Sequence, residues 1–305
     1  MPWWILDRMK FLVIGDLHGA MPCIPSEKFD AIIAPGDFCS DEAKGFMFQA
    51  LKERLADPKK DTQWYDIAGR KNARAIIKRS LADGRRVLEF LNSQGVPVYV
   101  VPGNWDWTGK EFGPEVKGWP FAEQDHYATL IRGLDDVVDS YHKAVSIGGL
   151  TIIGHGIIPG PEFPQYTEDV ARYSPAGLKR RKKWYDAERK KVAALFKKAK
   201  RPVVFITHNV PYNTPLDKIN NPASPRNGQH FGSVIAREMV DSYSPLLCIG
   251  GHMHEYFGYC KLGRTTCVNA GFGGAVYTII ETNGSAIQRM DFYRDGKRIA
   301  DSLLE

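Results

Sequence analysis

Five short apolar segments of the sequence are each followed, within a few residues, by side chains that can bind a metal ion. The segments span 11–14, 30–34, 96–101, 203–207 and 246–250, and the polar residues that follow them are, in order, Asp16 and His18, Asp37, Asn104 and Asp106, His208, and His252 and His254. Carboxylate and imidazole groups together suit divalent ions such as manganese, iron and zinc. This ordered set therefore predicts a metal site.

Seven of these residues, all except Asp106, are candidate ligands, which is more than one ion of about four to six coordination positions can use. They fit two ions that share one carboxylate, and Asp37, alone on its loop, is the natural bridge. We expect the two histidines of the H-x-H pair, His252 and His254, to reach two different ions. We therefore expect a binuclear centre.

Buried strands are the elements that must position these residues. The five apolar segments read as such strands, and ligands in open α/β sheets bind beyond the carboxyl ends of the strands. Two hairpins are also expected, one over 144–154 with its turn at Gly148-Gly149, and one over about 275–293 with a type I′ turn at Asn283-Gly284. Alternating strands and helices indicate a largely parallel sheet, and the hairpins indicate a second sheet.

Three helical regions are expected, at 41–57, 66–94 and 175–199. In the last, Ser174 is a good N-cap, Pro175 suits the first helical position, and one apolar stripe is formed by Leu178, Tyr185, Val192, Phe196 and Ala199. Residues 174–201 hold twelve Lys or Arg and two acids, a balance of +10, so the other 277 residues sum to −4. We favour a solvated amphipathic helix here, with contact to a phosphate backbone as the alternative.

The composition excludes several classes of protein. The chain has 305 residues, 43% of them hydrophobic and 25% charged, which is ordinary globular usage and argues against disorder. No apolar run approaches the roughly 18 residues that a membrane helix needs. The five cysteines form no C-x-x-C pair, and residues 1–10 do not resemble a signal peptide. We expect a cytoplasmic protein with free thiols, and Met9 offers a second plausible start.

The motifs D-x-H, G-D, G-N-x-D, a later His and G-H-x-H, in this order over residues 10–275, resemble those of the calcineurin-like metallophosphoesterase superfamily. The stretches H-N-V-P-Y-N-T-P-L-D (208–217) and H-F-G-S (230–233) are similar to a prokaryotic phosphoesterase branch of it. The resemblance implies the α/β class: a two-sheet β-sandwich flanked by helices in four layers. We expect one domain over 1–305, with helical insertions at 41–95 and 160–201.

The resemblance also implies which residue binds which ion. The first ion would be held by Asp16, His18, Asp37 and His254, and the second by Asp37, Asn104, His208 and His252. Two divalent ions are implied, with manganese expected and iron or zinc as alternatives. A hydroxide that bridges the ions would attack the phosphorus in line.

The sequence departs from the family pattern at Trp105, where family members usually have a histidine that assists the leaving oxygen. Indole is only a hydrogen-bond donor and does not titrate in the useful range, so the usual general acid is missing. Asp106, which would orient that acid, is retained. The candidate substitutes are His230 and His155, although a hydrogen-bonded loop histidine is the favoured interpretation of His155.

Three other polar residues are not expected to take part in the chemistry. His126 and His142 have no motif context and are interpreted as surface residues. Asn269 is interpreted as a turn residue.

These observations favour a phosphoesterase with two metal ions that acts on phosphodiesters. One alternative is a metal-dependent nuclease that binds nucleic acid through the basic helix at 175–199. The other is an inactive binding scaffold on the same fold, which Trp105 favours and the complete set of ligands disfavours. The sequence does not identify the substrate or the oligomeric state, and no membrane partner is expected.

Overall fold

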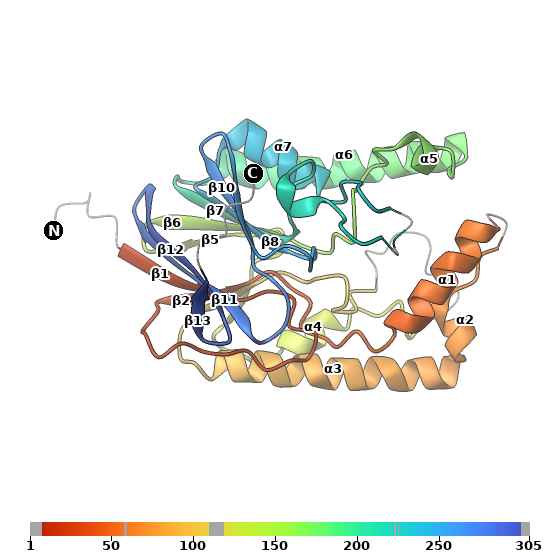
Figure 1. Ribbon diagram of the computed structural model, residues 1–305, viewed down its shortest axis with the longest axis horizontal. Coiled ribbons are helices and arrows are strands. Elements are labelled where there is room, and N and C mark those ends of the chain that lie inside the picture. The colour runs from red at the N-terminus through yellow and green to blue at the C-terminus, as the bar shows by residue number, and fades with distance from the viewer. Residues whose placement is uncertain (1–7, 58–59, 110–118, 223, 225, 300–305) are drawn as a thin grey trace.

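The computed structural model describes residues 8–57, 60–109, 119–222, 224 and 226–299. Two mixed β-sheets lie face to face, with helices on both outer sides (Figure 1). This four-layer α/β sandwich confirms the predicted fold class. The proposed extension before Met9 falls almost entirely outside the described residues. No helix within the described ranges is both long and apolar enough to cross a membrane.

The first sheet is built on four parallel strands that follow the chain order, β1-β2-β3-β4, and it is completed by antiparallel strands from the end of the chain. Its order is β13-β12-β11-β1-β2-β3-β4. The bounds are β1 (Arg8–Val13), β2 (Ala31–Ala34), β3 (Val98–Val100), β4 (Val137–Asp139), β11 (Val276–Asn283), β12 (Ala286–Arg294) and β13 (Lys297–Ile299).

The second sheet has the order β5-β6-β7-β8-β10-β9, with β6, β7, β8 and β10 parallel. Its bounds are β5 (Ala144–Ile147), β6 (Leu150–His155), β7 (Val203–Asn209), β8 (Leu247–Gly251), β9 (Gly258–Leu262) and β10 (Thr265–Asn269). The parallel strands of each sheet end at one edge, and the sandwich brings these two edges together.

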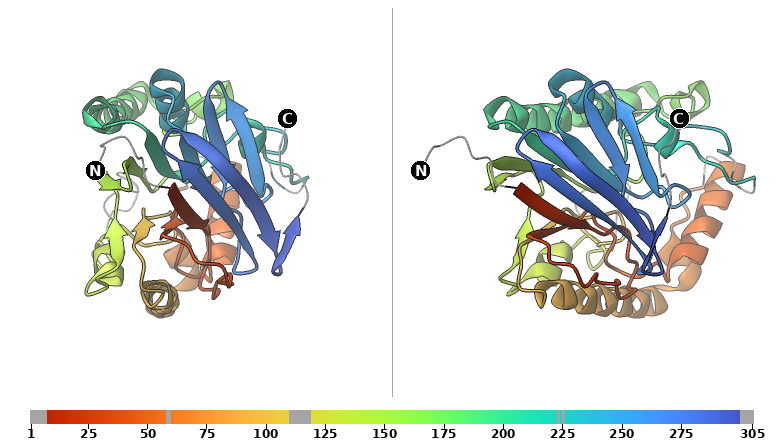
Figure 2. Two further views of the ribbon diagram at one scale, coloured as in Figure 1. Left: turned by 90° about the vertical axis from the view of Figure 1, so that its left-hand side faces the viewer. Right: turned by 60° about the vertical axis from the view of Figure 1, so that its left-hand side comes forward.

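Helices cover the outer face of each sheet, as Figures 1 and 2 show for α3 on one side and for α6 and α7 on the other. The helices are α1 (Lys44–Ala56), α2 (Trp64–Ala68), α3 (Arg70–Asn92), α4 (Tyr127–Ile131), α5 (Thr167–Val170), α6 (Pro175–Lys198) and α7 (Val234–Tyr243), with a 3-10 turn, η2 (Pro215–Asp217). Separate apolar cores lie between α3 and the first sheet, between the sheets, and between α6, α7 and the second sheet.

The five predicted strands and all three helical regions are confirmed, and the strands β4, β9 and β13 were not anticipated. The hairpin of β11 and β12 does not belong to a second sheet as predicted. Instead, β11 pairs antiparallel with β1 and completes the first sheet. Its loop is Gly284–Ser285, one residue later than predicted, because Asn283 still pairs with Ala286. Of the two loop residues, Gly284 has a positive φ and Ser285 does not. This pattern suits a type II′ turn rather than a type I′ turn.

The start of α6 is as predicted. Ser174 accepts a hydrogen bond from the Gly177 amide at 3.1 Å, and Pro175 is the first helical residue. The buried residues of the helix are Tyr185, Glu188, Val192 and Phe196. Leu178 and Ala199, the two ends of the predicted stripe, are only half-buried, and the acidic Glu188 was not foreseen on the buried face.

Candidate metal centre

All seven predicted ligands lie at the carboxyl ends of strands in the two sheets. Asp16 and Asp37 come three residues after the ends of β1 and β2, and Asn104 comes four residues after β3. His208 is the penultimate residue of β7, and His252 directly follows β8. Since β1, β2 and β3 are neighbours in one sheet and β7 and β8 in the other, one rim of the sandwich receives them all.

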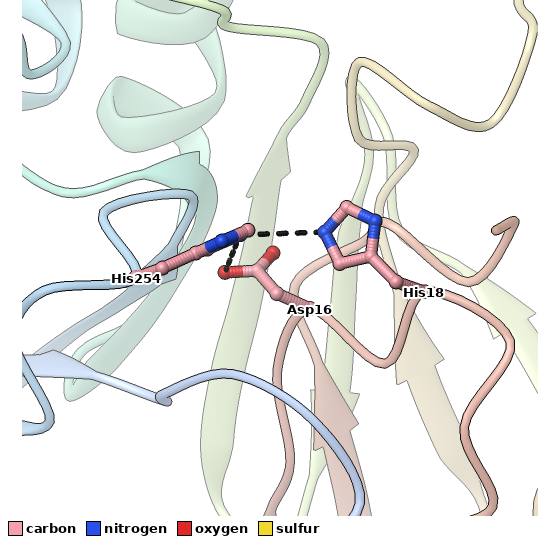
Figure 3. A group of neighbouring side chains, drawn as sticks. All are labelled: Asp16, His18 and His254. Carbon is pink, nitrogen blue, oxygen red and sulfur yellow. Dashed lines mark hydrogen bonds and ion pairs between the residues drawn. The ribbon is translucent and has the colours of Figure 1, made fainter. Parts of the chain in front are cut away.

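Asp16, His18 and His254 form the first group, whose ligand atoms all lie within 4.8 Å of one another. Figure 3 shows the two imidazoles turned toward each other above the carboxylate. The Nε2 atoms of His18 and His254 are 3.3 Å apart, and Nε2 of His254 is 3.9 Å from Oδ2 of Asp16. The loops after β1 and after β8 thus contribute to one potential ion site.

Asp37, His208 and His252 form the second group, again within 4.8 Å of one another. Nδ1 of His208 donates to the carbonyl oxygen of Pro35 at 2.9 Å, which leaves Nε2 as a lone-pair donor. This Nε2 atom faces Oδ1 of Asn104 at 2.8 Å. A nitrogen lone pair and an amide oxygen turned toward one point are suited to a cation.

Asp37 lies between the two groups. Its Oδ2 atom is 3.5 Å from Nε2 of His18 in the first group and 3.5 Å from Nε2 of His208 in the second. Among the described residues, this buried oxygen has no hydrogen-bond partner, whereas Oδ1 accepts the Trp105 amide at 2.8 Å. One oxygen of Asp37 is therefore fixed by the backbone and the other is available to both groups, as a bridging ligand requires.

Burial sets the electrostatics of the rim. It raises the pKa of Asp37 to about 8, and burial together with the neighbouring Asp37 carboxylate raises the pKa of Asp16. Burial also lowers the pKa of His18 and His254 to about 3 and that of His208 to about 4. Within the described part of the chain, the ion-pair contacts of the two carboxylates are all with histidines. This donor set fits divalent cations, which would offset the cost of burying the carboxylates.

The backbone at the rim adopts conformations that non-glycine residues rarely adopt. Asp16, His18, Asp37 and His252 have φ values between +42° and +66°. Such residues cost about 1–3 kcal/mol each and cluster at functional sites. Two glycines let the loops meet: a Cβ on Gly103 would lie 2.1 Å from Oδ1 of Asp37, and one on Gly251 would lie 2.5 Å from Oδ2 of Asp16.

Asp106 acts differently from the expected orienting role. Its buried carboxylate accepts four backbone N–H groups, those of Asp37, Phe38 and Gly103 at 2.8–2.9 Å and that of Cys39 at 3.2 Å. These bonds tie the loop after β3 to the loop after β2. Asp106 therefore holds Asp37 in place through the main chain.

Asn269 is the last residue of β10 and is fully buried, so it is more than a turn residue. Its Nδ2 donates to the Met253 carbonyl at 2.8 Å, between the two histidines of the H-x-H motif. This bond fixes the loop that carries His252 and His254. In the sequence, the available signal for this role was an amide side chain at the end of an apolar segment.

The four histidines outside the rim have different surroundings. Nδ1 of His230 is 2.7 Å from Oδ1 of Asp217, and Nε2 of His126 contacts the Phe121 carbonyl at 2.9 Å. The interpretation of His155 as a hydrogen-bonded loop residue is wrong, because it ends β6 and neither ring nitrogen has a hydrogen-bond partner among the described residues. The interpretation of His142 as a surface residue is also wrong, since it is half-buried and 3.0 Å from Glu188.

Two aromatic side chains flank the first group of ligands. Phe272 stacks on His254 with ring centroids 4.1 Å apart, and Trp105 presents an edge-to-face contact to His18 at 6.1 Å. Phe272 is 45% exposed, so part of its ring is free to contact a bound molecule. Sequence reasoning missed Phe272, which follows β10 in the segment V-N-A-G-F.

Comparisons with known proteins agree with this architecture. One crystal structure aligns with a TM-score of 0.61 at 16% identity, over 94% of this chain and 99% of its own. The crystal structure of TT1561 of Thermus thermophilus aligns with a TM-score of 0.51 at 14% identity, over 95% of this chain and 100% of its own. At these identities the likeness establishes the fold. No curated protein matches the sequence.

The sequence itself carries the assignment to a family. A family model described as calcineurin-like phosphoesterase matches residues 9–256, which include all seven predicted ligands. Members of that family bind two divalent metal ions, in keeping with the two groups of ligands at the rim. This chain belongs to the calcineurin-like phosphoesterase family.

Proposed function

We propose that this protein hydrolyses phosphodiesters with two divalent metal ions held at the rim, manganese being the expected metal. Asp16, His18, Asp37 and His254 would hold one ion, and Asp37, Asn104, His208 and His252 the other. The observation that carries the proposal is the position of Oδ2 of Asp37, 3.5 Å from a histidine of each group. When bound, the two ions would supply an activated water and stabilise charge on the phosphoryl group.

The chain's own residues prepare the rim for this chemistry. The bond from His208 to Pro35 selects the tautomer that presents Nε2, and the four N–H groups on Asp106 hold the Asp37 loop. Asp16 and Asp37 contribute two negative charges against the four positive charges of two divalent ions. The loaded rim would therefore remain cationic and attract an anionic phosphate ester.

If the leaving oxygen takes a proton from the chain, His230 is the candidate donor. Nδ1 of His230 is paired with the fully buried Asp217, so Nε2 is the ring nitrogen that would transfer the proton. The segment that contains His230 is attached to the rim by a hydrogen bond. The side chain of Asn209, next to His208, donates to the carbonyl of Phe231 at 3.0 Å. The dependence of the rate on the leaving group decides whether His230 acts.

A substrate panel with added Mn²⁺ tests the proposed function. The panel contains aryl phosphomonoesters, linear and cyclic phosphodiesters, and single- and double-stranded nucleic acids, with metal content measured on the same preparation. We expect about two ions per chain at the rim and the highest kcat/KM on a diester. A full metal complement with faster monoester cleavage would contradict the diester preference. A chain that binds few ions and cleaves nothing would support the inactive scaffold.

Phe272 gives the first prediction, on substrate preference. Stacking of a substrate ring on an aromatic side chain is worth about 1–3 kcal/mol, so F272A should raise KM for aryl diesters about tenfold with little change in kcat. Kinetics on an aryl and an alkyl diester check this. F48A is the matched control, since Phe48 is a 43% exposed ring on α1. Because Phe272 stacks on His254, metal content must stay unchanged; an equal loss on both substrates would contradict a stacking role.

The nuclease alternative is favoured by one feature of α6. Trp184 is 37% exposed and Arg181 lies 5.7 Å from its ring, a pairing that can stack on a base. Other charges of the helix are engaged: Lys182 pairs with Asp186, Arg189 with Glu238 and Lys191 with Glu188. Lys179, Lys183 and Lys190 are exposed, and within the described residues none of them has an ion pair.

Salt dependence checks this alternative as the second prediction. If α6 binds nucleic acid, log Kd should rise linearly with log salt, because each contacted phosphate releases about 0.9 counterions on duplex DNA. The triple variant K179Q/K183Q/K190Q should lower that slope by up to about 3. The control K28Q/K71Q/K78Q removes the same charge from exposed positions elsewhere. Absent or salt-independent binding would leave α6 as a solvated amphipathic helix.

A further inference from the structure

A third cluster of metal-ligand side chains lies outside the rim, between the second sheet and α6. It consists of His142, His155 and Glu188, whose ligand atoms all lie within 4.8 Å of one another. The three residues come from separate places: the turn before β5, the last position of β6, and the middle of the basic helix. Neither the predicted ligands nor the proposed reaction use them.

The direction of β6 separates this cluster from the rim. His155 shares a face with Ile153, which packs in the core beneath α6, whereas Ile152 packs between the two sheets. His155 pairs with Thr207 of β7, and the next residue, His208, points to the opposite face and toward the rim. The two sites therefore lie on opposite faces of the second sheet.

His155 is the residue in this cluster whose surroundings best indicate a bound ligand. Its side chain is 3% exposed, and among the described residues neither ring nitrogen has a hydrogen-bond partner. Most buried polar groups in proteins are hydrogen-bonded, so a buried imidazole with both nitrogens unpaired needs an explanation. Nε2 of His155 is 3.5 Å from Oε1 of Glu162, but this oxygen already accepts the Ser233 hydroxyl at 2.5 Å.

His142 and Glu188 complete the cluster. Nε2 of His142 is 3.0 Å from Oε2 of Glu188, yet this nitrogen is not aligned for a hydrogen bond with any described residue. The other carboxylate oxygen, Oε1, is 2.5 Å from Nζ of Lys191, which leaves Oε2 for the cluster. His142 reaches this place with φ of +52°, a conformation that is costly for a non-glycine residue and common at functional sites.

We infer that His142, His155 and Glu188 form a metal site separate from the rim, suited to Zn²⁺ or a chemically similar borderline divalent ion. Two imidazoles and one carboxylate are a familiar three-residue zinc set, in which water or another ligand fills the fourth position. The ion would join the edge of the second sheet to α6. Its effect would be to stabilise the packing of the basic helix, independently of the proposed phosphodiesterase activity.

Zinc stoichiometry tests the inference on the full-length protein. After loading with Zn²⁺ and dialysis against a weak chelator, the wild type should retain about three zinc ions per chain and E188Q about two. The amide of E188Q keeps the size of the buried side chain but is a poor zinc ligand. D186N is the matched control, because it makes the same carboxylate-to-amide change on the exposed side of α6. It should retain the wild-type content.

A second variant, H142N, and a second measurement, the zinc-induced rise in Tm, distinguish loss of the site from misfolding of E188Q. H142N shortens the side chain at a position with positive φ, which asparagine tolerates well. Both E188Q and H142N should lose part of the zinc-induced rise in Tm, while diester hydrolysis with Mn²⁺ stays within about twofold of wild type. Equal zinc content and equal Tm shifts in the wild type, E188Q and H142N would overturn the inference.

Discussion

Replacing Asp37 with alanine should abolish activity and lower metal content together. Asp37 is the residue whose Oδ2 atom faces a histidine of each group, so its loss weakens both proposed ion sites at once. We expect kcat/KM on phosphodiesters to fall about 10³-fold or more, with well under two ions retained per chain. Activity assays and metal analysis on the same purified samples check this prediction. Retained activity with a full metal complement would show that Asp37 is not the bridge.

Three comparisons sharpen the test of Asp37. D41A removes an acid from the same loop that pairs with Lys44, and it should leave both measurements unchanged. H252A and H254A should each weaken mainly one ion, because the two histidines lie in different groups. D37N keeps the acceptor for the Trp105 amide. Since burial disfavours the charged form of Asp37, D37N should unfold no more easily than wild type when both lack metal.

The rim could be predicted because its residues follow the strand ends in order along the chain. Asp16, Asp37 and His208 each follow or end an apolar segment short enough to read only as a strand. Parallel strands within one sheet bring their carboxyl ends together, and the two-sheet sandwich that the resemblance implies brings the ends of β7 and β8 to the same rim. The structure places all seven side chains at that edge, although it was the resemblance that divided them into two groups.

The sequence was less informative where distant segments pair. Nothing local indicates that β11 should lie against β1, a contact that spans most of the chain and moves the last hairpin into the first sheet. The cluster of His142, His155 and Glu188 could not be predicted for the same reason. Glu188 sits in a run of charges that predicts a solvated face, and His142 lies in a loop without a motif. Only the packing of α6 on β6 brings both residues to His155.

The role of Asp106 shows a similar limit. The resemblance implies that Asp106 orients the side chain at position 105. In the structure both of its oxygens are occupied by backbone N–H groups of the two neighbouring loops. A carboxylate bound in this way is committed to the main chain, whichever side chain stands at 105. This bears directly on what a histidine introduced there could do.

Substituted phosphodiesters should reveal the effect of Trp105. The indole cannot transfer a proton in the useful pH range, so the leaving oxygen in the wild type should depart largely unassisted. The rate should then fall steeply as the leaving-group pKa rises, and aryl diesters should react much faster than alkyl ones. A series of aryl diesters with graded substituents measures this slope. A flat dependence that becomes steep in H230A would instead assign the acid to His230, paired with Asp217.

W105H should restore part of the missing assistance. The Trp105 amide donates to Oδ1 of Asp37 at 2.8 Å, and a change of side chain leaves this backbone bond in place. General acid catalysis is typically worth about 10²–10⁴-fold, and the gain should be largest for the poorest leaving groups. We expect the lower end of that range, because the Asp106 carboxylate is already occupied by backbone amides and cannot orient the new imidazole. W105F, which removes the indole without adding an acid, should show no gain; an equal gain in W105F would mean that relief of crowding near His18, rather than proton transfer, raises the rate.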